Sequence, residues 1–85
     1  MTKSTHTPEY QRLVELLVET RRAAQLTQQQ VADRLGKPQS YLAKVEGAER
    51  RIDVVEFIAL AEALGLDAAD LLKTLVSEIA AGSEQ

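Results

Sequence analysis

Apolar residues recur at three- and four-residue spacing along almost the whole chain, and this helical periodicity is the feature that most restricts its fold. No stretch alternates with a period of two for long, and proline, glycine and asparagine are too few to build a set of hairpins. The sequence therefore predicts an all-α chain without strands. Its 85 residues correspond to one small domain, with no internal repeat.

Five helices are expected from the apolar stripes and from the residues that cap them. The first begins near Pro8, because proline suits the first turn of a helix. The second begins at Thr27, with Gln30 at the spacing of a capping box, and it ends at Gly36. The residues expected to face inward on these two helices are Tyr10, Leu13, Val14, Leu17, Arg21, Val31, Ala32 and Leu35.

The three remaining helices are delimited in the same way. They are expected to run from Lys37-Pro38 to near Gly47, from Asp53 to Gly65, and from Asp67 to Gly82-Ser83, which stops the last helix. Each of the two capping aspartates has an acidic residue three positions later, Glu56 and Asp70 respectively. The inward residues are Leu42 and Val45 on the third helix and Leu71, Leu72, Leu75, Val76 and Ile79 on the fifth. Residues 8–82 are thus expected to form the domain, between flexible ends at residues 1–7 and 83–85.

The composition excludes several classes of site. The chain has no cysteine and a single histidine, His6, so disulfides, the usual zinc sites and thiol nucleophiles are excluded. No glycine-rich phosphate motif is present, so we expect neither an enzyme nor a bound cofactor or metal. No apolar run approaches the roughly 20 residues of a membrane span, and the first residues lack the apolar middle of a signal peptide. A cytoplasmic protein without a membrane partner is therefore expected.

The net charge of −3 hides a segregation of charge along the chain. Residues 21–51 carry seven basic and three acidic side chains, a net charge of +4, whereas residues 52–85 carry one basic and seven acidic side chains, a net charge of −6. A basic middle followed by an acidic half predicts one face suited to an anion and another suited to a different partner.

Residues 25–47 are expected to form a helix, a tight turn and a second helix. Helices joined by so short a turn cross steeply, and the second then protrudes at one edge of the domain. A protruding helix fits the major groove of B-DNA, which is about 12 Å wide. With its apolar pair inward, this helix has an outward face without acids, whose candidate base-contacting residues are Gln39, Ser40, Ala43 and Lys44. The alternative is that these residues form an ordinary solvated face.

Candidate phosphate contacts surround that helix. Gln28 stands at the start of the second helix, where free backbone N–H groups point at an anion. Tyr41 lies at the margin of the third helix, where it is expected to pack against the domain and offer its hydroxyl. The full candidate set is Thr27, Gln28, Lys37, Tyr41, Arg50 and Arg51. Such contacts position a protein on DNA and do not specify a sequence.

A family resemblance covers about residues 13–72. Leu26-Thr27-Gln28, Ala32, Leu35-Gly36, Ser40-Tyr41-Leu42 and Glu46 resemble the helix-turn-helix family of phage repressors (lambda-repressor-like, Cro-type or Xre), and the likeness continues through residues 50–57 and 63–65. The resemblance implies a five-helix DNA-binding domain, commonly a dimeric transcriptional regulator or a DNA-binding antitoxin. It implies that Gln28 contacts phosphate and that Gln39, Ser40 and Lys44 face bases.

The resemblance also implies a partly buried ion pair between Arg21 and Glu46. The sequence supports the pair independently, because Arg21 falls on the apolar face of the first helix. Two positions depart from the family pattern. Pro38 replaces the usual serine or threonine, and Ala48 stands where the family usually has glycine, so the end of the third helix is expected to shift by one residue.

The fourth helix is apolar nearly all round, so it is either deeply buried or shared with another surface. In so small a domain, we expect part of the fourth and fifth helices to form a partner interface, most simply a homodimer. The expected interface residues are Phe57, Leu60, Leu71, Leu75 and Ile79. The alternative is that the fifth helix only covers the fourth within one chain.

These observations predict a sequence-specific DNA-binding regulator. The expected form is a dimeric repressor whose two third helices lie about 34 Å apart on double-stranded DNA and read a palindromic operator. The alternative is an antitoxin or adaptor, whose fourth and fifth helices bind a partner protein such as a toxin.

Overall fold

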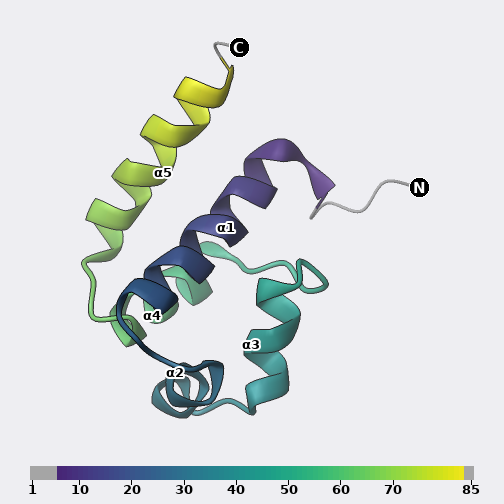
Figure 1. The fold of residues 1–85 in the computed structure, drawn as a ribbon, viewed down its shortest axis with the longest axis vertical. Helices are drawn as coiled ribbons and strands as arrows, with labels where there is room; N and C mark the ends of the chain where they lie inside the picture. The colour runs from purple at the N-terminus through teal and green to yellow at the C-terminus, as the bar shows by residue number, and fades with distance from the viewer. Residues whose placement is uncertain (1–5, 84–85) are drawn as a thin grey trace.

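The computed structural model describes residues 6–83, and over this range it contains five helices and no strand. The helices are α1 (Pro8–Ala23), α2 (Gln28–Leu35), α3 (Gln39–Glu46), α4 (Val54–Ala63) and α5 (Ala68–Ser83) (Figure 1). The predicted all-α, five-helix fold is confirmed. Residues 1–5 and 84–85, which make up most of the two expected flexible ends, lie outside the described residues.

The helix starts follow from local chemistry. The Thr27 hydroxyl accepts from the Gln30 amide N–H while the Gln30 side chain accepts from the Thr27 N–H, so this capping box is complete. Asp53 and Glu56 form the same reciprocal pair at the start of α4. Asp67 accepts from the amide of Asp70 at the start of α5. Each of these caps satisfies backbone N–H groups that have no partner inside the helix.

Helix α5 is described as far as Ser83, and the next residues lie outside the described range, so the stop at Gly82-Ser83 stays a prediction. Gly36 ends α2 in the left-handed conformation that glycine favours, with φ of 68°. The end of α3 does not shift, because Ala48 itself adopts the left-handed conformation with φ of 58°.

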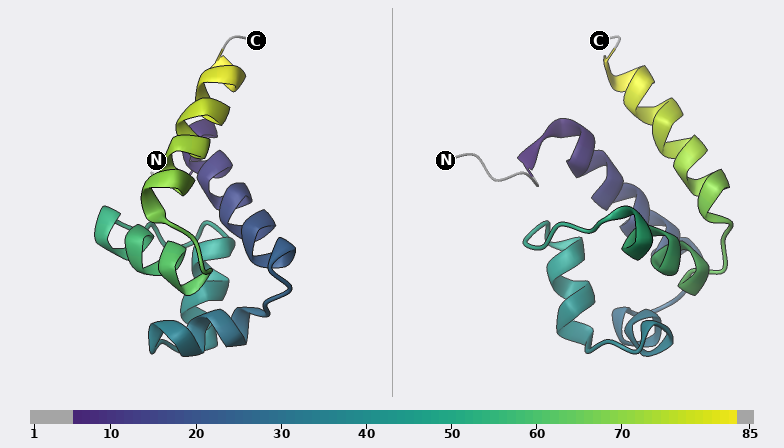
Figure 2. Two further views of the ribbon diagram at one scale, coloured as in Figure 1. Left: turned by 90° about the vertical axis from the view of Figure 1, so that its left-hand side faces the viewer. Right: turned by 180° about the vertical axis from the view of Figure 1, so that it is seen from behind.

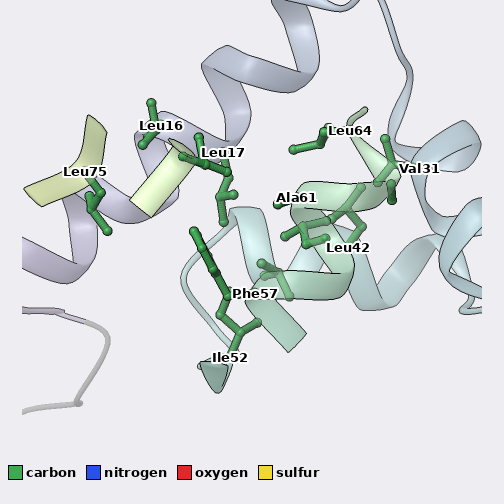
Figure 3. Close-up of a cluster of buried hydrophobic side chains, with 13 residues drawn as sticks. Leu16, Leu17, Val31, Leu42, Ile52, Phe57, Ala61, Leu64 and Leu75 are labelled. Atoms are coloured by element: carbon green, nitrogen blue, oxygen red, sulfur yellow. The ribbon is translucent and has the colours of Figure 1, made fainter. Parts of the chain in front are cut away.

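A single main core joins all five helices (Figure 3). Its largest fully buried side chains are Leu42, Val31 and Val45, so the inner pair of α3 lies at the centre of the domain. The other buried members include Leu16, Leu17, Ile52, Phe57, Leu60, Ala61, Leu64, Leu71 and Leu75. A smaller cluster of Tyr10, Val14 and Ala48 lies beside it and fixes the segment that follows α3 against α1.

The packing leaves α3 at the edge of the molecule. Helix α3 contacts α2 and α1, while α5 contacts α1 and α4 (Figure 2). Figure 1 shows α3 and α5 on opposite sides of the molecule. The outer surface of α3 is therefore open to a partner, and it is separated from the outer surface of α5.

Candidate nucleic-acid interface

The outer face of α3 carries the candidate base-contacting residues as the periodicity indicated. Gln39, Ser40 and Lys44 are exposed and Ala43 is half-buried, while Leu42 and Val45 on the opposite face are fully buried. The helix is held by its apolar side, which leaves a short, polar, acid-free outer face. Gln, Ser and Lys side chains on such a face can bond to base edges in a major groove.

A chain of hydrogen bonds runs from this face to α1. The Gln39 amide donates to Oε1 of Gln28 (2.6 Å), and the Gln28 amide donates to Oε1 of Glu46 (2.9 Å). Glu46 in turn accepts from Arg21 through both oxygens. Because each group is held by the next, the amide of Gln39 has a defined orientation before any ligand arrives.

The expected ion pair between Arg21 and Glu46 is present and bidentate. The Arg21 Nε lies 2.7 Å from Oε2 of Glu46, and the two side chains are only 12% and 8% exposed. Arg21 also donates to the Leu26 carbonyl (2.8 Å), and its hydrogen bond with Glu46 raises the pKa of Arg21. The pair joins α1, the start of α2 and the end of α3 into one rigid unit.

Two cations from opposite ends of α3 lie against the ring of Tyr41. The Lys37 Nζ is 5.5 Å from the ring centroid and the Arg50 guanidinium carbon is 4.8 Å from it. The Tyr41 hydroxyl donates to Oε2 of Glu56 (3.3 Å), so it is turned toward α4. Burial and the nearby Glu56 charge raise the pKa of Tyr41. Tyr41 thus packs at the margin of α3 as expected, with its hydroxyl already bonded.

The segment after α3 is fixed by an unforeseen contact with α1. The backbone N–H of Ile52 donates to the Tyr10 hydroxyl (3.0 Å) in a buried position. The Arg51 guanidinium carbon lies 4.7 Å from the centroid of the same ring. Tyr10 therefore anchors the loop that carries Arg50 and Arg51. The contact spans more than 40 positions of chain, and no local sequence signal indicates it.

The remaining phosphate candidates lie at the start of α2. Thr27 is exposed and its hydroxyl accepts the capping bond, while Gln28 is half-buried within the hydrogen-bond chain. The first intrahelical bond there joins the Val31 N–H to the Thr27 carbonyl, so the first-turn amides point outward. The cap, the turn residue Lys37 and the Arg50-Arg51 loop together flank the outer face of α3.

The expected partner-interface residues require a correction. Phe57, Leu60, Leu71 and Leu75 are buried within the single chain, and Ile79 is half-buried against the same core, because α5 packs on α1 and α4. They are core residues of the monomer. The large apolar side chains that remain exposed, with exposed fractions between 41% and 74%, are Val54, Val55, Ile58, Leu66, Leu72 and Val76.

A groove of about 530 Å³ lies between the first turns of α1 and the last turns of α5, away from α3. Three of its charged side chains pair with one another, because Arg12 bonds both Glu78 and Glu15 at 2.7 Å. Among residues 6–83 no group of three or more metal-binding side chains comes together. Over the same residues, no helix has the length and apolar character needed to span a bilayer.

Comparisons with known proteins agree on one kind of domain. Residues 12–75 match the model of a helix-turn-helix domain family. A solved structure of an XRE-family like protein from Pseudomonas syringae pv. tomato str. DC3000 is 45% identical to this chain, with a TM-score of 0.82. That similarity covers 88% of this chain and 92% of the other. No curated protein matches the chain.

Proposed function

The chain belongs to the XRE-like helix-turn-helix family, and we propose that it acts as a dimeric repressor that reads a palindromic DNA operator through α3. Family membership supports a DNA-binding transcription regulator. The observation that carries the finer proposal is the outer face of α3, where Gln39, Ser40 and Lys44 are exposed while the inner face is locked in the core.

The hydrogen bond between Gln39 and Gln28 suits Gln39 to read adenine. A glutamine amide has two N–H donors and one carbonyl acceptor, and Gln28 takes one donor. The second donor and the carbonyl oxygen remain for N7 and the N6 amino group of adenine, the bidentate pattern that this base presents in the major groove. Lys44, one turn and a half further along, reaches guanine acceptors or a phosphate, and Ser40 and Ala43 complete the contact face.

Phosphate contacts on both sides of α3 would hold it in the groove. We assign them to the start of α2 with Thr27 and Gln28, to Lys37 in the turn with the neighbouring Tyr41, and to Arg50 and Arg51 in the loop. The net charge of +4 over residues 21–51 favours this surface for the DNA backbone. Occupation of the operator would then exclude the transcription machinery.

Dimerisation is proposed through the exposed apolar residues of α4 and α5. Glu78 bonds Arg12 of α1, so the side of α5 that carries Glu78 faces α1. At 100° per residue, Leu72 and Val76 lie roughly 120° and 160° around the axis of α5 from Glu78. These two residues are therefore on the side of α5 that is turned away from α1. In the left view of Figure 2, the N-terminal part of α4 lies on that side of α5. On α4, the Val54 side chain is 73% exposed and the Ile58 side chain is 41% exposed. We call the surface formed by the exposed residues Val54, Val55, Ile58, Leu72 and Val76 the α4–α5 apolar face.

The test is selection of binding sites from a random DNA duplex pool at physiological salt, followed by titration of the enriched duplex. The proposal predicts an enriched two-fold site with half-sites about 34 Å apart, one turn of DNA. A pool without enrichment, with binding that disappears as salt rises, would contradict sequence-specific reading and leave only the non-specific attraction of the basic surface.

The second candidate function is an antitoxin or adaptor whose α4–α5 apolar face binds a partner protein such as a toxin. The observation that favours it is the exposure of Val54, Val55 and Ile58 next to a strongly acidic half of the chain, which suits a basic partner. Sedimentation of the purified chain separates the two candidates. A dimer without any partner supports the repressor, whereas a stable monomer at tens of micromolar supports the adaptor.

A further inference from the structure

We propose that Glu56 is a positioning residue of the DNA interface: together with Tyr41, its carboxylate holds the Arg50 guanidinium in the orientation from which it contacts a phosphate. The inference rests on the proposed DNA-binding function and adds to it a residue from α4, a helix that lies outside the helix-turn-helix unit. Nothing in the spacing of the sequence indicates more for Glu56 than the cap of α4.

Glu56 is the point where three separate parts of the chain meet. One of its oxygens accepts from the backbone N–H of Asp53 (2.9 Å), which completes the cap of α4. The other oxygen accepts from Nη2 of Arg50 (2.8 Å) and from the Tyr41 hydroxyl (3.3 Å). The carboxylate is thus fixed by α4 itself, and it joins the loop after α3 to the first half of α3.

Arg50 is held from three directions. Besides Glu56, its Nη1 donates to the Arg51 carbonyl (3.1 Å), and its guanidinium lies over the Tyr41 ring. A free arginine side chain loses considerable rotamer freedom when it binds, and these contacts impose that ordering before DNA arrives. The carboxylate stays charged at neutral pH, because the hydrogen bond from Arg50 lowers the pKa of Glu56.

The same contacts leave Arg50 able to bind DNA. A guanidinium has five N–H donors, and the contacts with Glu56 and the Arg51 carbonyl use two of them. The Arg50 side chain is still 41% exposed, so a phosphate oxygen can approach the remaining donors without displacing Glu56. Glu56 therefore acts as a support for Arg50 and need not be released on binding.

If Glu56 positions Arg50, then removal of its charge weakens DNA binding, which is the opposite of the effect expected from charge alone. An acid near the DNA backbone repels phosphate, so its removal by itself strengthens binding. Glu49 provides the matched control, since it is an exposed acid in the same loop, one residue before Arg50. Glu49→Gln removes one negative charge there without disturbing the contacts of Arg50, while Glu56→Gln removes the charge that orients it. Glutamine at position 56 still fits the cap of α4.

The experiment measures the affinity of the full chain for two duplexes, the site enriched from the random pool and a scrambled duplex of the same length. We expect Glu56→Gln to weaken binding to both by about two- to fivefold, as for a partly exposed ion pair. Glu49→Gln should bind as tightly as the unchanged chain or more tightly. Tyr41→Phe, which keeps the ring but removes the hydroxyl bond, should show a smaller loss than Glu56→Gln.

A double-mutant cycle with Arg50→Ala separates positioning from general destabilisation. Arg50→Ala should reduce the slope of log affinity against log salt by about 0.9, as expected for one lost phosphate contact. If Glu56 acts through Arg50, then Glu56→Gln causes no further loss of affinity or slope in the Arg50→Ala background. A loss that persists in this background, or tighter binding by Glu56→Gln alone, overturns the inference. If the unchanged chain enriches no duplex, the proposed function itself fails and the inference fails with it.

Discussion

The two halves of the domain present opposite kinds of surface on one core. The half built from α2, the turn and α3 exposes polar and basic side chains whose amides and guanidinium groups are organised by hydrogen bonds and an aromatic ring. The half built from α4 and α5 exposes apolar side chains within an acidic stretch of chain. The difference shows that a net charge of −3 says little about this molecule, because the fold separates a polar, basic surface from an apolar surface in the acidic part of the chain.

The contrast extends to how each surface is fixed. On the α3 side, Arg21 and Glu46 connect the outer face to α1 through a buried ion pair. On the α4–α5 side, the exposed side chains Val54, Val55 and Ile58 are apolar and cannot form ion pairs or hydrogen bonds of this kind. Substitutions on the first surface should therefore affect folding and DNA reading together, whereas those on the second should affect association alone.

The largest effect is expected from Glu46→Ala. The change leaves Arg21 buried without its carboxylate and removes the acceptor of the Gln28 amide. Breaking a buried pair in this way costs about 3 kcal/mol or more of unfolding free energy. Urea denaturation followed by circular dichroism measures it. Glu62→Ala, which removes an exposed acid from α4, is the control and should change stability by less than about 0.5 kcal/mol. Equal losses for both variants would contradict the contrast between the two surfaces.

An intermediate effect is expected from Ile58→Glu. Ile58 is 41% exposed on the α4–α5 apolar face, so a charge there should leave the fold intact but place two like charges at a two-fold interface. We expect the dimer dissociation constant to rise about tenfold or more, measured by analytical ultracentrifugation. Ala59→Glu adds the same charge at an exposed position of α4 that lines a pocket with Arg34 and Leu35 of α2, and it should leave dimerisation unchanged. If both variants dissociate the dimer alike, the interface lies elsewhere.

The smallest effect concerns two non-glycine residues with left-handed backbone. Gln25 has φ of 60° and is exposed, so Gln25→Gly should relieve strain and raise stability by about 1 kcal/mol. Ala48 has φ of 58°, but its methyl group is buried against Tyr10 and Val14. Because Ala48→Gly also loses about 0.8 kcal/mol of methyl burial, its net effect should be close to zero. Thermal unfolding of the two variants side by side checks the difference, and a larger gain at position 48 would contradict it.

A feature could be predicted from the sequence when the residues that interact are close together along the chain. The caps at Thr27 and Asp53 and the left-handed Gly36 were predictable, because each depends on chemistry within three or four positions. The outward face of α3 was also predictable, since periodicity alone separates Gln39 and Lys44 from the buried Leu42.

The buried side of α4 and the contacts between distant residues could be identified only in the folded structure. On an almost wholly apolar α4, periodicity could not decide which side is buried, so Phe57 and Leu60 were assigned to a partner while Val54 and Ile58 are the exposed residues. The contact between Tyr10 and Ile52, which fixes the loop after α3, joins residues far apart in the chain and left no pattern to recognise. The same holds for the salt bridge from Arg12 to Glu78 and for the second role of Glu56.

In the proposed complex with DNA, α3 reads bases while the residues on both sides of it hold phosphates. The most direct test measures Gln39→Ala and Arg51→Ala against the enriched duplex and a set of its single-base variants. Gln39→Ala should cost about 1–3 kcal/mol of binding free energy and relax the preference at one base pair, whereas Arg51→Ala should weaken binding to every duplex alike. If both substitutions lower affinity uniformly and leave every base preference unchanged, α3 does not read the DNA sequence.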